Sequence, residues 1–283
     1  MRTGLDRLRA EMLAGPSVGL LSHYAALDRD YRSSVSRLAS TEGIQLSMLF
    51  GPQHGFHGET QDNMIEWEGY RHPELGIPVH SLYGRTREPD PVLLQGLDCL
   101  VVDLQDIGAR YYTYVYTMAY CMRACSKAGV RVLVLDRPNP ITGTRVEGPV
   151  IEEKHFSFVG KYPIPIRYGL TAGELAGMIK GEGWMNNMEN LDLKVIPMEG
   201  WRRELWFDET GLPWLKPSPN IPSILTEILY PGLWLVEALN VSVPVHQGCE
   251  VAPNVQLTMN GVPDGIQHIG DLVHLVVGET ECV

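Results

Sequence analysis

The stretch CLVVDLQDIGARYYTY, residues 99–114, decides the fold of this chain. Five of its first six residues are apolar and do not alternate with polar residues, which is typical of a strand buried on both faces of a parallel sheet. Polar residues follow at once, and a segment with apolar residues at helical spacing begins at Thr113. A strand, a polar turn and a helix in this order predict one unit of an α/β domain.

The same pattern recurs on either side of this stretch. The predicted strands are residues 17–22, 45–50, 99–104, 130–135 and 193–196, and the predicted helices are residues 32–41, 113–127 and 171–180. Gly129 follows the longest of these helices, at the position where a glycine commonly ends a helix. Strands that alternate with helices predict a doubly wound, mainly parallel sheet.

The alternation becomes less regular from about residue 187. The proline-rich segment WLKPSPNIPS, residues 214–223, is predicted to be extended, because proline lacks a backbone donor and disfavours helix at the preceding residue. A helix-like segment, YPGLWLVEALN, follows it. We therefore expect one domain over residues 1–187 that carries the functional cleft, and a second, smaller domain over residues 188–283.

Composition excludes several classes of protein. The chain has 34 acidic and 23 basic residues, and it contains no basic run, so we expect no nucleic-acid partner. It contains no run of about 18 apolar residues, so we expect no membrane span. Its first residues show no apolar signal-peptide core, and its five cysteines form no disulfide framework. Both observations predict a cytoplasmic, reducing location.

Polar clusters follow four of the predicted strands. They begin at His23, Gly51, Asp103 and Asp136. In an open parallel sheet, ligands bind outside the carboxyl ends of the strands, so the four clusters are expected to form one cleft. Carboxylates, imidazoles, a guanidinium group and aromatic rings in one cleft are suited to a carbohydrate, because carboxylates perform acid/base chemistry and rings pack on sugar C–H groups.

Two details keep alternatives open. Glu174 lies three residues after Thr171, so it could satisfy the helix start as part of a capping box, or it could face the cleft and bind a sugar hydroxyl. His54 and His57 lie in a glycine-rich loop without a clear third ligand, so no metal site is predicted. The chain also lacks the glycine-rich fingerprint of a dinucleotide site, so we expect no cofactor.

Several long motifs resemble those of the exo-β-N-acetylmuramidases, glycoside hydrolase family 171. They are LFGPQHGFHGETQDN (residues 49–63), IPVHSLYG (77–84), DLQDIGARYYTY (103–114), LDRPNPITG (135–143), SFVGKYPIPIRYGLTAGELA (157–176) and KPSPNIP (216–222). They stand in the family's order, and the resemblance extends over about residues 17–242. Motifs as long and unusual as DIGARYYTY and LDRPNP are not expected by chance.

The resemblance implies a Rossmann-like domain followed by a smaller C-terminal α+β domain. It also implies an enzyme that releases N-acetylmuramic acid from the non-reducing end of peptidoglycan fragments, as in cell-wall turnover and recycling. No metal or cofactor is implied, and the oligomeric state is left open. The alternative is a protein of the same fold that binds an amino sugar or a muropeptide without cleaving it.

The family motifs also assign residues to the site. The resemblance implies Asp106 and Glu174 as proton-transfer residues, with His54 as a supporting donor. The substrate-binding residues that it implies are Gln53, Asp103, Arg110, Tyr111, Asp136, Arg137, Asn139, Glu147, Arg167, Lys216, Ser218 and Asn220. The lactyl carboxylate of N-acetylmuramic acid calls for a bidentate arginine, for which Arg110, Arg137 and Arg167 are the candidates.

The chain departs from the family at two places. Many members have glutamate where this chain has Gln53, and an amide can neither give nor take a proton in catalysis. Three alternatives follow: Asp106, Glu147 or Glu174 transfers the proton, or this branch of the family cleaves a different sugar, or the chain only binds sugar. The second departure is the tail at residues 243–283, which fits no family pattern. We expect it to be the result of a truncation or a frame change, and we assign it no role.

Overall fold

The computed structural model describes residues 1–58, 60, 65–218 and 221–238. The chain divides into two compact units, Met1–Pro219 and Asn220–Val283. The expected boundary after residue 187 differs from this division, because a strand at Leu193–Ile196 pairs with the sheet of the first unit. In the second unit, helix α5 (Ile224–Ala238) accounts for all but the first three of the described residues. The atypical tail at residues 243–283 lies outside the described residues.

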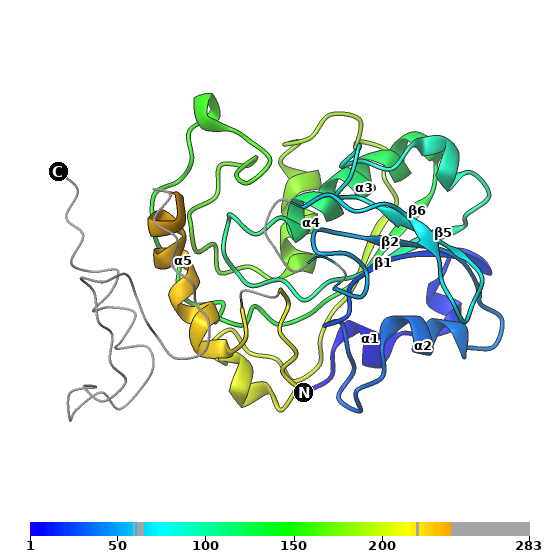
Figure 1. Cartoon of the computed structure of the whole chain (residues 1–283), viewed down its shortest axis with the longest axis horizontal. Helices are drawn as coiled ribbons and strands as arrows, with labels where there is room; N and C mark the ends of the chain where they lie inside the picture. Colours follow the sequence, from blue (N-terminus) through cyan, green and yellow to red (C-terminus); the bar gives the residue numbers. More distant parts are fainter. Residues whose placement is uncertain (59, 61–64, 219–220, 239–283) are drawn as a thin grey trace. The chain divides into compact units, whose positions relative to one another are not determined.

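A seven-stranded sheet forms the centre of the first unit (Figure 1). Its strands are β1 (Ser17–Ser22), β2 (Gln45–Gly51), β3 (Tyr70–Arg71), β4 (Pro78–Ser81), β5 (Cys99–Asp103), β6 (Arg131–Leu135) and β7 (Leu193–Ile196). They lie in the order β3-β4-β2-β1-β5-β6-β7, and every neighbouring pair is parallel except β3 and β4. The six parallel strands therefore follow the Rossmann order, in which the direction of winding reverses between β1 and β5.

Helices cover both faces of this sheet. Helices α1 (Gly4–Arg7) and α2 (Ser34–Ala39) lie on one side, and α3 (Tyr114–Ala128) and α4 (Ala172–Gly181) lie on the other (Figure 1). Short 3₁₀ helices span Ala10–Met12, Pro91–Leu94, Glu153–His155 and Phe207–Thr210. Helix α3 ends at Gly129, which has the left-handed φ of 71°. The predicted doubly wound α/β fold and its three helices are confirmed.

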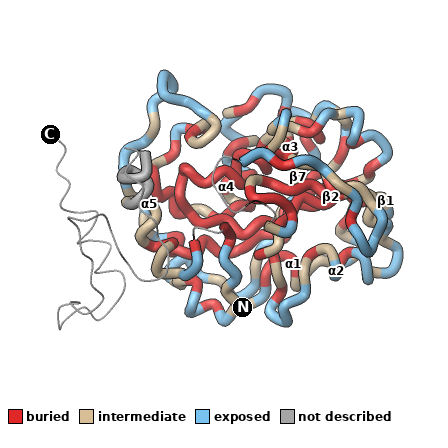
Figure 2. The backbone as a smooth tube through the Cα atoms, in the orientation of Figure 1, coloured by how far each residue is buried: buried red, intermediate tan, exposed pale blue. Residues whose placement is uncertain are grey.

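The core lies between these two helical layers. Every residue of β5 is buried, as are the last four residues of β6 (Figure 2). Because both faces of these strands are covered, neither strand alternates apolar with polar residues. Strands β3 and β4 were not predicted, since they are short and lie at the edge of the sheet, where only Val79 of β4 is buried. Among the described residues, no helix is both long enough and apolar enough to cross a membrane.

Candidate active site

The turns that leave β1, β5 and β6 are joined by hydrogen bonds at the point where the winding reverses. Nε2 of His23, directly after β1, accepts a bond of 3.0 Å from the backbone N–H of Gln105. The side-chain amide of Gln105 donates to the carbonyl oxygens of Asp106 at 2.9 Å and Pro138 at 3.2 Å. Three of the four predicted polar clusters therefore meet at one edge of the sheet.

Asp106 lies in the centre of this junction and is almost fully buried. Its Oδ2 atom accepts hydrogen bonds from the backbone N–H of Gly108, at 2.8 Å, and from the hydroxyl of Tyr168. Burial raises the pKa of Asp106 to about 6, while these two bonds act in the opposite direction. The carboxyl group can therefore hold or release a proton near neutral pH, as a general acid requires.

The turn after β2 joins the same cluster through the start of α3. The hydroxyl of Thr113 donates to Oε1 of Gln53 at 2.9 Å. The hydroxyl of Tyr114 donates to the carbonyl oxygens of Gln53, at 3.4 Å, and Pro217, at 2.9 Å. The ring of Tyr114 also packs edge-on against the ring of His23, with centroids 4.7 Å apart. The fourth polar cluster and the proline-rich segment thus reach the first three.

Two buried histidines in this cluster are neutral at pH 7. Burial lowers the pKa of His54 to about 4, and burial together with the nearby Arg137 guanidinium lowers the pKa of His23 well below its usual range. His54 also adopts a left-handed φ of 69°, which fixes it in the tight turn after β2. A neutral imidazole can donate or accept a hydrogen bond, but it does not supply a proton as an imidazolium would.

Asp103 and Arg137 bind each other rather than the open side of the site. The Arg137 guanidinium donates to both carboxyl oxygens of Asp103, at 2.6 and 2.9 Å, and both side chains are buried. Ser34 donates a further bond of 2.5 Å to Asp103, and Arg137 also donates to the carbonyl oxygen of Leu27. The pair therefore ties the end of β5 to the end of β6.

The other two candidate arginines have different partners. Arg167 forms an ion pair of 2.7 Å with Glu147, and the backbones of the two residues also pair as an antiparallel bridge. Within the part of the chain that the structure describes, Arg110 donates to the carbonyl oxygens of Pro149 and Ile164, both at 2.7 Å. Among the described residues, no carboxylate forms an ion pair with the buried Arg110 guanidinium.

Asp136 and Glu174 hold the start of α4. Asp136 accepts hydrogen bonds from the backbone N–H of Gly173, at 2.8 Å, and the hydroxyl of Thr171, at 2.9 Å, and burial raises its pKa to about 6. Glu174 completes the capping box with Thr171, and its other carboxyl oxygen forms an ion pair with Arg203. Of the two roles considered for Glu174, the structure therefore contains the helix cap.

The remaining expected residues occupy varied positions. Asn139, in the turn after β6, accepts a hydrogen bond from the backbone N–H of Ile141 and donates one to the carbonyl oxygen of Leu170. The ring of Tyr111 lies 5.6 Å from the Arg110 guanidinium. Lys216 is exposed and Ser218 is buried, while Asn220 lies outside the described residues. Tyr168 and Gln105 also contact Asp106 directly, although neither was predicted as a site residue. The only feature of the sequence that could have indicated them is that each is a polar side chain within a family motif.

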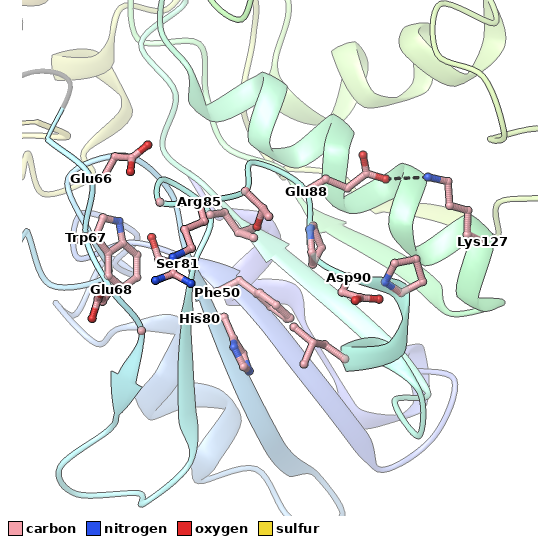
Figure 3. Close-up of a pocket in the computed structure, with 17 residues that line it drawn as sticks. Phe50, Glu66, Trp67, Glu68, His80, Ser81, Arg85, Glu88, Asp90 and Lys127 are labelled. Carbon is pink, nitrogen blue, oxygen red and sulfur yellow. Dashed lines mark hydrogen bonds and ion pairs between the residues drawn. The ribbon is translucent and has the colours of Figure 1, made fainter.

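A pocket of about 950 Å³ lies beside β2 and β4 and is lined by other residues (Figure 3). Phe50 and His80 project into it and stack with centroids 5.4 Å apart. Glu88, on its other side, is held by Arg123 and Lys127. None of the site residues expected from the sequence lines this pocket, so it is not the candidate active site.

Comparisons with known proteins show which family the chain belongs to. The family model described as exo-beta-N-acetylmuramidase NamZ, N-terminal, matches residues 18–225. The peptidoglycan beta-N-acetylmuramidase NamZ of Bacillus subtilis (strain 168) is 42% identical over 245 residues, which are 86% of this chain and 58% of that protein.

Two crystal structures of DUF1343 family proteins from Bacteroides fragilis NCTC 9343 are also similar. BF0371 is 38% identical with a TM-score of 0.78, and the match covers 86% of this chain and 61% of that one. BF0379 is 32% identical with a TM-score of 0.70, and the match covers 83% of this chain and 61% of that one. The chain thus spans about three fifths of the length of these relatives. Because the family model matches well over half of it, the chain belongs to the exo-beta-N-acetylmuramidase NamZ family, through the family's N-terminal region.

Proposed function

We propose that this chain is a glycoside hydrolase that releases N-acetylmuramic acid from the non-reducing end of peptidoglycan fragments, a reaction of cell-wall turnover and recycling. The observation that carries the proposal is Asp106. It is a buried carboxyl group at the point where the winding of the sheet reverses, and its pKa lies near neutrality, at about 6. The same chain is 42% identical to a peptidoglycan beta-N-acetylmuramidase.

In the proposed reaction, the carboxylic acid of Asp106 gives its proton to the glycosidic oxygen as the bond from that oxygen to the anomeric carbon breaks. A water molecule then adds its hydroxyl group to that carbon and passes its second proton to a base, so the products are the two free sugars. Glu174 is less suited to the acid role, because both of its carboxyl oxygens already hold partners. Gln53 cannot transfer protons in this way.

Arg110 is the proposed partner of the lactyl carboxylate. Arg137 and Arg167 already hold the carboxylates of Asp103 and Glu147, whereas Arg110 holds only carbonyl oxygens among the described residues. A buried cation without a counter-charge is costly, and an anionic group of the substrate would neutralise it. An arginine also binds a carboxylate with two parallel hydrogen bonds, which fixes the orientation of the sugar.

The test is incubation of the purified chain with the disaccharide N-acetylmuramyl-β-1,4-N-acetylglucosamine, followed by chromatography of the products. We expect both monosaccharides from the native chain and a loss of at least about 100-fold in rate for Asp106→Asn, since general acid catalysis contributes about 10²–10⁴-fold. Circular dichroism and melting of Asp106→Asn serve as the folding control. Undiminished turnover by Asp106→Asn would remove Asp106 from the mechanism.

A binding protein without activity is the second candidate, and Gln53 is the observation that favours it. Its side-chain amide oxygen accepts a hydrogen bond from the hydroxyl of Thr113. Many family members have a glutamate at this position, which could transfer a proton where the amide cannot. Calorimetric binding of N-acetylmuramic acid without hydrolysis of the disaccharide would support this candidate. Gln53→Glu, assayed beside the native chain, would then be expected to produce hydrolysis.

A further inference from the structure

The two carboxyl oxygens of Asp106 have different surroundings. Oδ2 accepts one hydrogen bond from the backbone N–H of Gly108, at 2.8 Å, and another from the hydroxyl of Tyr168. Oδ1 is buried, and it has no hydrogen-bond partner among the described residues. A carboxyl oxygen offers two lone pairs, so both acceptor positions of Oδ2 are occupied.

We propose that Tyr168 is a positioning residue for Asp106: by occupying Oδ2 it leaves Oδ1 as the oxygen that carries the transferable proton. A proton on Oδ2 would displace one of the two donors and leave a buried polar group without its bond, which is unfavourable. The inference rests on the proposed function, in which Asp106 is the acid, and it adds the residue that selects the reacting oxygen.

Both donors are held in place by the fold around them. Tyr168 is buried, and it directly follows Arg167, whose backbone exchanges hydrogen bonds of 2.9 and 3.0 Å with Glu147. Gly108 has a left-handed φ of 77°, and a Cβ atom there would lie 2.4 Å from Oδ1 of Asn139. Only glycine fits this turn, so its N–H has a fixed direction toward Asp106.

The hydrogen bond from Tyr168 also opposes the effect of burial on Asp106. Burial raises the pKa of the carboxyl group to about 6, and hydrogen bonding from Tyr168 and from the backbone N–H groups of Gly108 and Ile107 lowers it. Removing the Tyr168 hydroxyl should therefore make Asp106 hold its proton to higher pH. Removing the hydroxyl of a buried tyrosine that does not contact Asp106 should leave this pKa unchanged.

The test compares Tyr168→Phe with a matched control, Tyr162→Phe. Tyr162 is also fully buried, but its hydroxyl has no hydrogen-bond partner among the described residues. The pKa of Asp106 is measured by carboxyl ¹³C NMR on aspartate-labelled protein, with the signal assigned from Asp106→Asn. We expect Tyr168→Phe to raise the pKa of Asp106 by about one pH unit, the value of a single hydrogen bond, and Tyr162→Phe to leave it unchanged.

A second measurement does not need the variant to fold. In the native chain, the ring ¹³Cζ signal of Tyr168 should titrate together with Asp106, while that of Tyr162 should not. The proposal would be overturned if Tyr168→Phe left the pKa of Asp106 unchanged, or if Tyr162→Phe shifted it equally. It would also be overturned if the Tyr168 signal did not change as Asp106 titrates.

Disaccharide hydrolysis separates this inference from the proposed function. If the native chain cleaves the substrate, the basic limb of the pH–rate profile for kcat should move to higher pH in Tyr168→Phe, with KM little changed. If the pKa moves as expected but the native chain cleaves nothing, the proposed function fails while the positioning of the Asp106 proton stands.

Discussion

Asp103 and Asp106 lie three residues apart at the end of the same strand, but their partners give them different chemistry. Asp103 is fully buried, and both of its carboxyl oxygens accept hydrogen bonds from Arg137, so its charge is neutralised within the protein. Asp106 lacks an ion pair among the described residues, and burial raises its pKa to about 6. Residue type and spacing predicted that both would lie in the site, but only the three-dimensional pairing separates the structural carboxylate from the proposed acid.

The Asp103–Arg137 pair should be important for stability. Asp103→Asn removes one partner and leaves a buried guanidinium without its counter-charge, so we expect a loss of about 3–5 kcal/mol in the free energy of unfolding. Urea denaturation followed by circular dichroism measures it. Asp192→Asn is the control, because it breaks the more exposed Arg131–Asp192 pair, which should be worth at most about 1 kcal/mol. Equal losses in the two variants would contradict the expectation.

The proposed role of Arg110 predicts a change in specificity rather than a general loss. Arg110→Gln should lower kcat/KM for a chromogenic N-acetylmuramide by about 100-fold, the value of a charge-assisted bond of about 3 kcal/mol. The matching N-acetylglucosaminide lacks the lactyl carboxylate, so its turnover should change far less. Arg131→Gln, at an exposed ion pair, is the control. A parallel fall for both substrates would indicate that Arg110 supports the fold instead.

At the level of elements, the start of α4 shows how a cap can resemble a catalytic carboxylate in the sequence. Thr171 and Glu174 satisfy the first backbone N–H groups of the helix reciprocally, and Asp136 at the end of β6 adds a further acceptor. This arrangement anchors the helix to the sheet beside the candidate site. The sequence contained the capping pattern, but it could not show that Arg203 takes the remaining oxygen of Glu174.

Glu174→Gln tests whether this residue takes part in proton transfer. Glutamine also completes a capping box, so we expect the free energy of unfolding to change by at most about 0.5 kcal/mol and turnover to stay within about threefold of the native chain. Glu174→Ala should cost about 1 kcal/mol, since it removes the cap. A loss of turnover in the glutamine variant with the stability unchanged would assign Glu174 to the chemistry.

The elements themselves were largely predictable. Strands β1 and β7 have the bounds that the sequence predicted, and the predicted bounds of β2, β5 and β6 differ by one residue. Each is a short segment rich in Val, Leu or Ile, and its length and its polar or turn-forming flanks identify it as a strand. Strand β4 escaped prediction because its four residues lie near the edge of the sheet and three of them are only partly buried.

For the whole molecule, the sequence predicted the class of fold but not the order of the strands. That order places β1 beside β5, so that His23 and Gln105 meet although they are 82 positions apart in the chain. The prediction that polar turns gather at the carboxyl ends of the strands follows from the parallel sheet alone, and the contacts of the four turns agree with it. Long-range contacts decide which polar atoms already have hydrogen-bond partners, and a local sequence pattern does not contain that information.

The bond between His23 and Gln105 has a consequence for how this protein acquires its properties during folding. It links segments that become neighbours only after β1 and β5 pair, and the Asp103–Arg137 contact needs the crossover through α3 as well. Such distant pairings close large loops and form slowly. A refolding chain should therefore regain its helical content before the contacts around Asp106 form. Recovered activity would then show that the whole sheet has formed, and not only that the chain has become compact.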